Sequence, residues 1–189
     1  MDVFDALETA VDEFGRRLTT VAPDQWSSST PCDEWDVHYL VAHVVGGNRF
    51  AAAVLAGSTF GDAIAAVMSS PQLGADPLAA WAVTAAAQAA AFRQTGALDA
   101  AVDHPVGTIT GGDLLGFRTF DITLHAWDLA CAIGADASLP DELVTHVIGI
   151  IESGLLGMGF GIVPVQSAAD AAPQARMLAL AGRVGSPHG

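Results

Sequence analysis

Four polar side chains lie at helical spacing in an otherwise apolar segment, at Arg118, Asp121, His125 and Asp128. Each helical residue advances by about 100°, so Asp121 and His125 would lie about 40° apart on successive turns. A carboxylate oxygen and an imidazole nitrogen placed in this way can bind the same metal ion. Polar groups on one side of a core helix are costly unless they are paired or functional. The spacing therefore predicts either half of a metal site or a solvated ladder of ion pairs from Arg118 through Asp121 to His125.

Two further histidines, His38 and His43, occur in an earlier apolar segment. They would lie about 140° apart around a helix, which excludes a metal ion shared by both. His43 flanks the apolar stripe of that segment, so we predict that His43 faces inward and His38 faces solvent. An inward histidine is either a core residue bonded to a backbone carbonyl or a ligand. With Asp121 and His125, His43 would complete three protein ligands from facing helices, the number typical of a catalytic metal site.

The periodicity of the apolar residues predicts the helices that would carry these side chains. Asp33 or Asp36 could cap one of them, and Asp76 followed by Pro77 is a strong start for another. No segment shows the alternation of a strand, and residues 102–112 are predicted to form an extended loop. The expected fold is all-α, with four or five helices in a bundle and a single domain over residues 1–189. The expected helices are 4–21, 37–55, 62–68, 77–95, 113–133, 140–158 and a short tail helix near 173–182.

The composition limits the classes of function. The chain has 189 residues, 7 arginines, no lysine and 21 acidic residues, which give a formal net charge of −14. Such a chain repels phosphate, so we expect neither nucleic acid nor an anionic membrane surface as a partner. The 51% hydrophobic content is enough for a folded core. Two cysteines, no basic leader and no apolar run of about 20 residues indicate a cytoplasmic protein.

Three stretches of the sequence resemble a known family. They are TPCDEWDV at residues 30–37 with LVAH at 40–43, DITLHAWDLA at 121–130, and the ending at 164–183. Together they are similar to actinobacterial proteins related to the N-terminal domain of mycothiol-dependent maleylpyruvate isomerase, in the DinB/YfiT-like superfamily of helical bundles. The resemblance covers nearly the whole chain, and its motifs occur in the same order.

The resemblance implies a DinB-like four-helix bundle, with short additional helices, that holds a divalent metal ion. Carried over to this sequence, the ligands would be His43, Asp121 and His125. Zinc is the first expectation, and a nitrogen and oxygen ligand set also suits nickel, iron or manganese. The resemblance further implies mycothiol as a cosubstrate. The isomerase has glutamate where this chain has Asp121, and it has a C-terminal domain that this sequence lacks, so maleylpyruvate isomerisation is not expected to carry over.

These observations lead to a metal-dependent protein that uses mycothiol as a transferase or isomerase of small molecules. A cation can deprotonate a bound thiol, and the thiolate is the nucleophile. Arg118 either holds a substrate carboxylate as a cofactor-binding residue or pairs with Asp121, and we favour the pair. Asp128 would either orient His125 or be an acidic residue on the surface without a role. Cys32 would be a fourth metal ligand, a redox-active thiol or a small residue packed in the core.

Two other hypotheses compete with this one. The first is a metal-binding or small-ligand-binding bundle without catalysis, and the second is a metal-free bundle whose polar face is only a ladder of ion pairs. The Ala-rich helix expected at 77–95 could also pack against a second copy in a homodimer.

Overall fold

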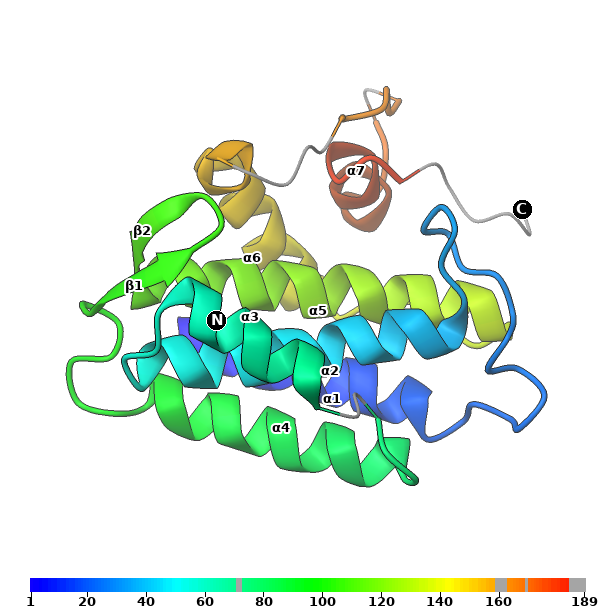
Figure 1. The fold of residues 1–189 in the computed structure, drawn as a ribbon. Coiled ribbons are helices and arrows are strands. Elements are labelled where there is room, and N and C mark those ends of the chain that lie inside the picture. Colours follow the sequence, from blue (N-terminus) through cyan, green and yellow to red (C-terminus); the bar gives the residue numbers. More distant parts are fainter. Residues whose placement is uncertain (71–72, 159–162, 169, 184–189) are drawn as a thin grey trace.

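The computed structural model describes residues 1–189 except 71–72, 159–162, 169 and 184–189. Within these residues the chain forms helices joined by short connections and one small hairpin (Figure 1). The elements are α1 (Val3–Leu18), α2 (Val37–Leu55), α3 (Phe60–Ser69), α4 (Pro77–Phe92), β1 (Ala101–His104), β2 (Gly107–Thr110), α5 (Gly111–Ile133), α6 (Asp141–Glu152), the 3-10 helix η1 (Leu155–Met158) and α7 (Pro173–Leu180).

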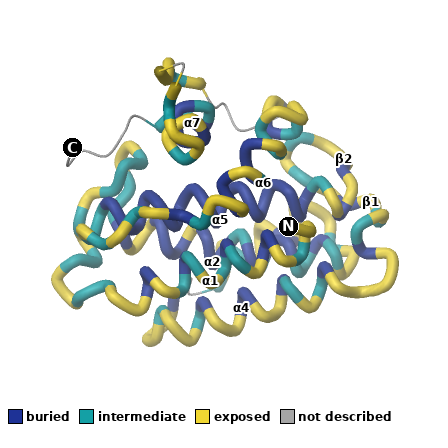
Figure 2. Tube along the Cα trace, turned by 180° about the vertical axis from the view of Figure 1, so that it is seen from behind, coloured by how far each residue is buried: buried dark blue, intermediate teal, exposed yellow. Residues whose placement is uncertain are grey.

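Helix α5 lies at the centre, and every residue from Leu114 to Cys131 is buried. It packs against α1 and α2 on one side and against α6 on the other, while α4 packs against α2 and α1. In Figure 2 the α5 trace is dark along most of its length, whereas α4 alternates between buried and exposed turns. The all-α four-helix bundle predicted from the sequence is thus confirmed, with α1, α2, α4 and α5 as its members and α3, α6 and α7 added around it.

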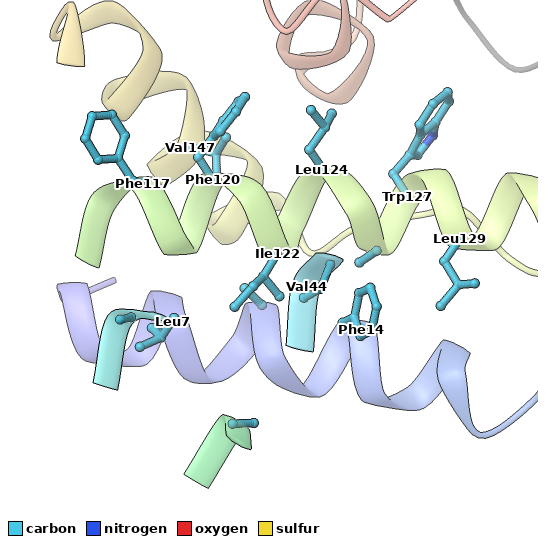
Figure 3. Packing of buried hydrophobic residues seen from close by; sticks show 14 of the residues in the cluster. Leu7, Phe14, Val44, Phe117, Phe120, Ile122, Leu124, Trp127, Leu129 and Val147 are labelled. Carbon is cyan, nitrogen blue, oxygen red and sulfur yellow. The ribbon is translucent and has the colours of Figure 1, made fainter. Parts of the chain in front are cut away.

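The apolar residues of α5 explain why it is covered on both sides. Phe120, Leu124 and Trp127 project toward α6 and α7 in Figure 3, and Ile122 and Leu129 project toward α1. Burial of each such side chain contributes about 1.5–3 kcal/mol relative to exposure. A helix that is apolar all round must lie inside a protein. The polar groups of α5 between Leu114 and Cys131 are therefore held inside the molecule.

Local sequence sets the ends of the helices. Asp36 caps α2 by accepting a hydrogen bond from the Tyr39 amide at 2.8 Å, and α2 has the predicted bounds. Asp76 caps α4, whose first residue is Pro77. The left-handed Gly134, with a φ of 67°, ends α5 as predicted.

Several boundaries differ from the prediction. Residues 102–112 are not a plain loop, because β1 pairs antiparallel with β2 in a hairpin. The strands are four residues each, too short to show a clear alternation. Helix α5 begins two residues early, because Thr110 is the N-cap and Asp113 completes a capping box with it.

The other differences lie at the ends of helices. The helix expected at 140–158 is divided into α6 and η1, and α1, α4 and α7 end two or three residues sooner than expected. Helix α3 is longer than the expected 62–68, since it begins two residues earlier and ends one residue later. No helix in the described part of the chain is both long and apolar enough to cross a lipid bilayer.

Candidate metal centre

The loop before α2 carries two residues of the candidate site. It is folded back on itself by hydrogen bonds from the Thr30 amide to the Trp35 carbonyl and from the Val37 amide to the Ser28 carbonyl, both 3.0 Å. The Thr30 hydroxyl also accepts from the Cys32 amide at 3.1 Å. In Figure 1 this blue segment rises beside α5. The loop thus brings Cys32 and Trp35 against the C-terminal half of α5.

Helices α2 and α5 bring together the three residues predicted as ligands. The His43 Nε2 lies 3.1 Å from Asp121 Oδ1, and the His125 Nε2 lies 3.3 Å from the same oxygen. One donor atom from each of the three residues lies within 4.8 Å of the other two. Asp121 and His125 are almost fully buried, whereas 38% of the His43 side chain is exposed. The prediction that His43 faces inward is therefore met only in part, since His43 forms the rim of the site, while His38 is exposed as expected.

Hydrogen bonds define which imidazole nitrogen of His125 can bind a cation. The His125 Nδ1 lies 2.9 Å from Asp128 Oδ2, so in neutral His125 the Nδ1 proton is donated to that carboxylate. The lone pair of Nε2 then points toward Asp121 Oδ1. Two electron-rich atoms face each other at this point, and the arrangement favours a positive charge between them.

The pKa directions agree with this electrostatic arrangement. Burial alone would raise the pKa of Asp121, but His43, His125 and Arg118 hold that pKa well below its usual value. Burial alone would lower the pKa of His125, but the Asp121 carboxylate, with smaller contributions from Asp128 and Cys32, raises it well above its usual value. The site therefore attracts a proton or another cation to the His125 Nε2.

Arg118 neutralises the other oxygen of Asp121. Its Nη1 donates to Asp121 Oδ2 at 2.6 Å. Its Nη2 donates to Asn48 Oδ1 at 2.9 Å and to the Val44 carbonyl at 3.1 Å. Its Nε donates to Gln88 Oε1 at 3.3 Å. All three guanidinium nitrogens are thus engaged in a buried network that joins α2, α4 and α5. This geometry supports the Asp121 pair over the alternative in which Arg118 holds a substrate carboxylate.

A second cluster lies at the opposite edge of the His125 ring. The Cys32 Sγ is 3.3 Å from Asp128 Oδ2 and 3.9 Å from His125 Nδ1. Arg183 forms two hydrogen bonds to Asp128, at 2.9 and 2.8 Å, and its Nη2 is 3.4 Å from the Cys32 Sγ. Cys32, His125 and Asp128 could also surround an ion. However, Asp128 already has a full counter-charge in Arg183, and Cys32 is not grouped with His43 and Asp121, because it lies at the Nδ1 edge of the His125 ring.

Trp35 covers the two histidines of the first cluster. Its ring centroid lies 4.8 Å from that of His43 and 5.6 Å from that of His125. Trp35 therefore lines the first cluster, whereas Trp81 and Trp127 are buried in the hydrophobic core.

An apolar pocket opens beside the first cluster. It has a volume of about 460 Å³ and is lined by α2, α3, β1 and α5. His43, Arg118 and Asp121 contribute to its wall. His43 and Asp121, two of the three candidate ligands, therefore face a cavity that is large enough for a small molecule.

Two contributors to this region were missed by sequence reasoning. Arg183 is 55 residues from Asp128 and had no local partner that could have identified it. His104 had no partner at helical spacing either, yet its ring stacks on Phe117 at 4.9 Å and lines the apolar pocket. The second cysteine, Cys131, is buried in the core and lies outside both clusters.

Comparison with known proteins places the chain in a family. Residues 7–130 match the family described as the mycothiol maleylpyruvate isomerase N-terminal domain. Two uncharacterized proteins, one from each of two strains of Mycobacterium tuberculosis, are 35% identical over 146 residues, which is 77% of this chain and 75% of theirs.

Solved structures show which known fold the chain shares. The crystal structures of the mycothiol-dependent maleylpyruvate isomerase, and of a variant of it in which one histidine is replaced by alanine, each match with a TM-score of 0.61. Each match covers 87% of this chain and 76% of the isomerase at 18% identity, so it shows a shared fold. The resemblance read from residues 30–43 and 121–130 is confirmed: the chain belongs to the family of the mycothiol maleylpyruvate isomerase N-terminal domain.

Proposed function

We propose that this protein binds a divalent metal ion through His43, Asp121 and His125 and uses it with mycothiol to transfer or isomerise a small molecule. Zinc is the expected metal, and the nitrogen and oxygen donors also suit nickel, iron or manganese. The family and its structurally similar member, a mycothiol-dependent isomerase, support the use of the thiol.

The observation that carries the proposal is the convergence of three donor atoms on one point. One donor atom from each of the three residues lies within 4.8 Å of the other two, and both imidazole Nε2 atoms lie within 3.3 Å of Asp121 Oδ1. His43 and Asp121 also line the neighbouring pocket. Asp128 fixes the tautomer of His125 through its contact with Nδ1, as carboxylates do for metal-binding histidines. Three protein ligands leave further coordination positions for a thiol or a substrate. The residues therefore fit a catalytic type of metal site.

Each residue has a defined part in this proposal. His43 would be the ligand nearest to solvent, because it lies at the rim of the site. Asp121 and His125 would be the two buried ligands. Arg118 holds Asp121 Oδ2, so that Oδ1 remains directed at both histidines. When bound, a divalent cation supplies the positive charge that lowers the pKa of a thiol and yields thiolate at neutral pH.

Metal analysis of the purified protein tests the ligand assignment. After metal-replete expression we expect close to one equivalent of a divalent metal, and less than about a tenth of an equivalent would exclude a tight site. His43→Ala should lose the metal and keep its helical circular dichroism, because His43 lies on the surface side of the site. His38→Ala, an exposed histidine on the same helix, is the matched control and should retain the metal. Full metal occupancy in His43→Ala would show that the ligand assignment is wrong.

A second experiment separates catalysis with a thiol from simple metal binding. Cobalt is substituted into the protein, and mycothiol is added while the visible spectrum is recorded. We expect a thiolate-to-cobalt band that is absent from His43→Ala. A cobalt spectrum that does not respond to millimolar thiol would overturn the use of mycothiol and favour a non-catalytic metal-binding bundle.

A further inference from the structure

Among the described residues that line the apolar pocket, His104 is the only one that comes from the hairpin. Side chains alternate between the two faces of a strand, so His104 shares a face of β1 with Val102. Val102 pairs with Ile109 across the hairpin, and both residues are buried in the core. The hairpin therefore directs His104 toward the bundle and into the wall of the pocket.

Two aromatic rings of the bundle hold the His104 imidazole in place. It stacks on Phe117 of α5, with ring centroids 4.9 Å apart and an angle of 12° between the planes. Phe50 of α2 lies 6.0 Å from the same imidazole in a T-shaped arrangement. Both arrangements are favourable for aromatic pairs. Apolar contacts thus fix the position of the ring and leave its nitrogens available for polar contacts.

The two nitrogens of His104 have different surroundings. The Val106 amide donates a hydrogen bond to Nδ1 at 3.5 Å. Burial lowers the pKa of His104, so the ring is neutral at pH 7. In a neutral imidazole one nitrogen accepts and the other carries the proton, which places the proton on Nε2. Nε2 has no hydrogen-bond partner within the described part of the chain.

The other polar groups of the pocket lie on α2 and α5. The described ones are His38, Tyr39, His43, Arg118 and Asp121. The first two are exposed at the start of α2, and the last three belong to the candidate metal centre and the network around it. The rest of the described wall consists of apolar residues and glycine. His104 is therefore a separate polar group in an otherwise apolar part of the pocket.

Helical geometry gives the separation between His104 and the candidate ligands. Phe50 follows His43 by seven residues on α2, and Phe117 precedes Asp121 by four residues on α5. With a rise of 1.5 Å per residue, the rings that hold His104 lie about 6–11 Å along these helices from the ligand positions. A small organic molecule is long enough to reach both ends.

We propose that His104 donates a hydrogen bond from Nε2 to an acceptor oxygen of the molecule that binds in the apolar pocket. When such a molecule displaces water, the Nε2 proton loses a partner unless the ligand supplies one. The ligand class is thus a small molecule with an apolar body and a carbonyl, carboxylate or similar oxygen at one end. Its use as the substrate of the thiol reaction rests on the proposed function, whereas its binding to His104 does not.

Two neutral probes of similar size test the hydrogen bond. Acetophenone and ethylbenzene share a phenyl ring with a two-carbon substituent, and only acetophenone has an acceptor oxygen. The dissociation constant of each is measured by titration of the purified protein, followed in heteronuclear NMR spectra. The ratio of the ethylbenzene constant to the acetophenone constant then reports the acceptor, because the apolar contacts of the two probes are alike.

Substitutions of His104 separate its donor from its ring. His104→Phe keeps a ring against Phe117 and removes the donor, so the ratio should fall about fivefold, which corresponds to about 1 kcal/mol. His104→Gln keeps an N–H donor near the position of Nε2, so its ratio should stay within about twofold of that of the parent protein. His146→Phe is the matched control, since His146 is also half-buried but lies on α6 outside the pocket. An unchanged ratio in His104→Phe, or an equal fall in His104→Gln, would overturn the proposal.

The ring of His104 gives a direct measurement in the parent protein, even where a variant binds neither probe. Its nitrogen resonances are assigned by their absence from His104→Gln, and their chemical shifts show which nitrogen carries the proton. We expect the proton on Nε2, and we expect acetophenone but not ethylbenzene to shift the Nε2 resonance. A proton on Nδ1, or the same response to both probes, would contradict the proposal.

The outcomes also separate this proposal from the proposed function. Neither probe carries a charge or a thiol, and His104 is not a candidate ligand, so the metal content and the cobalt spectrum report independently on the metal site. A low metal content together with the expected ratios would overturn the proposed function and support the role of His104. If the acetophenone oxygen instead binds the metal, a chelator removes the preference for acetophenone and His104→Phe does not, which would overturn the role of His104.

Discussion

At the residue scale, the site depends on the two edges of one imidazole ring. The His125 Nε2 faces Asp121 at 3.3 Å, and its Nδ1 faces Asp128 at 2.9 Å. Asp128 in turn accepts two hydrogen bonds from Arg183. Burial alone would lower the pKa of Arg183, but the Asp128 carboxylate raises it. A charged chain of three groups therefore orients the nitrogen that is proposed to bind the metal.

Replacement of Asp128 tests this orientation. Asp128→Asn keeps the shape of the side chain but removes the charge that fixes the His125 tautomer, so we expect metal affinity to fall about 10- to 100-fold. A competitive titration with a chromophoric chelator measures the change. Asp141→Asn alters an exposed carboxylate at the start of α6 and should leave the affinity unchanged. Equal affinity in both variants would show that Asp128 has no orienting role.

At the element scale, Arg118 joins three helices through a close approach of α2 to α5. A Cβ atom at Gly47 would lie 2.2 Å from the Arg118 Nη1, so only glycine leaves room for the guanidinium there. The arginine in turn bonds to the Val44 carbonyl and Asn48 of α2 and to Gln88 of α4. The position of Asp121 relative to His43 thus depends on the packing of these helices.

A methyl group at Gly47 should disturb both the packing and the site. In Gly47→Ala, Arg118 must move away and lose buried hydrogen bonds, so we expect the free energy of unfolding to fall by about 1–3 kcal/mol. Gly149→Ala is the control, because a Cβ atom at this exposed position of α6 has no neighbour within 4 Å. The control should gain up to about 1 kcal/mol from the better helix propensity of alanine. Urea denaturation measures both, and an undiminished stability of Gly47→Ala would contradict the proposed role of Arg118.

At the scale of the whole molecule, a second buried arginine joins α1 to the connection before α6. The Arg17 Nη1 bonds to Glu13 Oε2, and its Nη2 bonds to the Ser138 carbonyl at 2.8 Å. The Arg17 side chain is fully buried, and Glu13 is only 16% exposed. Burial alone would raise the pKa of Glu13, but hydrogen bonds from Arg16 and Arg17 lower it below the usual 4.5. The charge of Glu13 is therefore more favourable in the folded chain than in the unfolded one.

This pair should make stability depend on pH in a defined window. Because the folded pKa of Glu13 is lowered, its contribution is complete above about pH 4.5 and is lost as the pH falls through the folded value. At pH 7 the free energy of unfolding of Glu13→Gln should be about 1–3 kcal/mol lower than that of the parent protein. This difference should shrink as the pH falls. Glu8→Gln breaks the exposed pair with Arg93 and should cost no more than about 1 kcal/mol. Urea titrations between pH 3 and 7 measure these differences, and a constant difference across that range would contradict the assignment.

Local patterns were sufficient to predict the helices and half of the candidate site. The bounds of α2, the cap at Asp76 and the end of α5 were predicted correctly, and Asp36 was one of the two candidate caps of α2. Each of these features depends on residues only a few positions apart. The pair of Asp121 and His125 was predictable for the same reason, since helical geometry alone fixes their separation. The hairpin was missed because its strands are too short for a pattern to show.

The amino-acid sequence by itself determined the helical elements, the family motifs and the types of side chain available for a metal. Only the tertiary structure decided that His43 sits at the rim, that Arg118 is held by α2 and α4, and that Arg183 reaches Asp128 across 55 positions. The physical reason is that short-range steric and hydrogen-bonding rules fix a helix, whereas contacts between distant segments depend on how complete helices pack around α5. Those contacts decide which charges meet inside the molecule and which face the pocket.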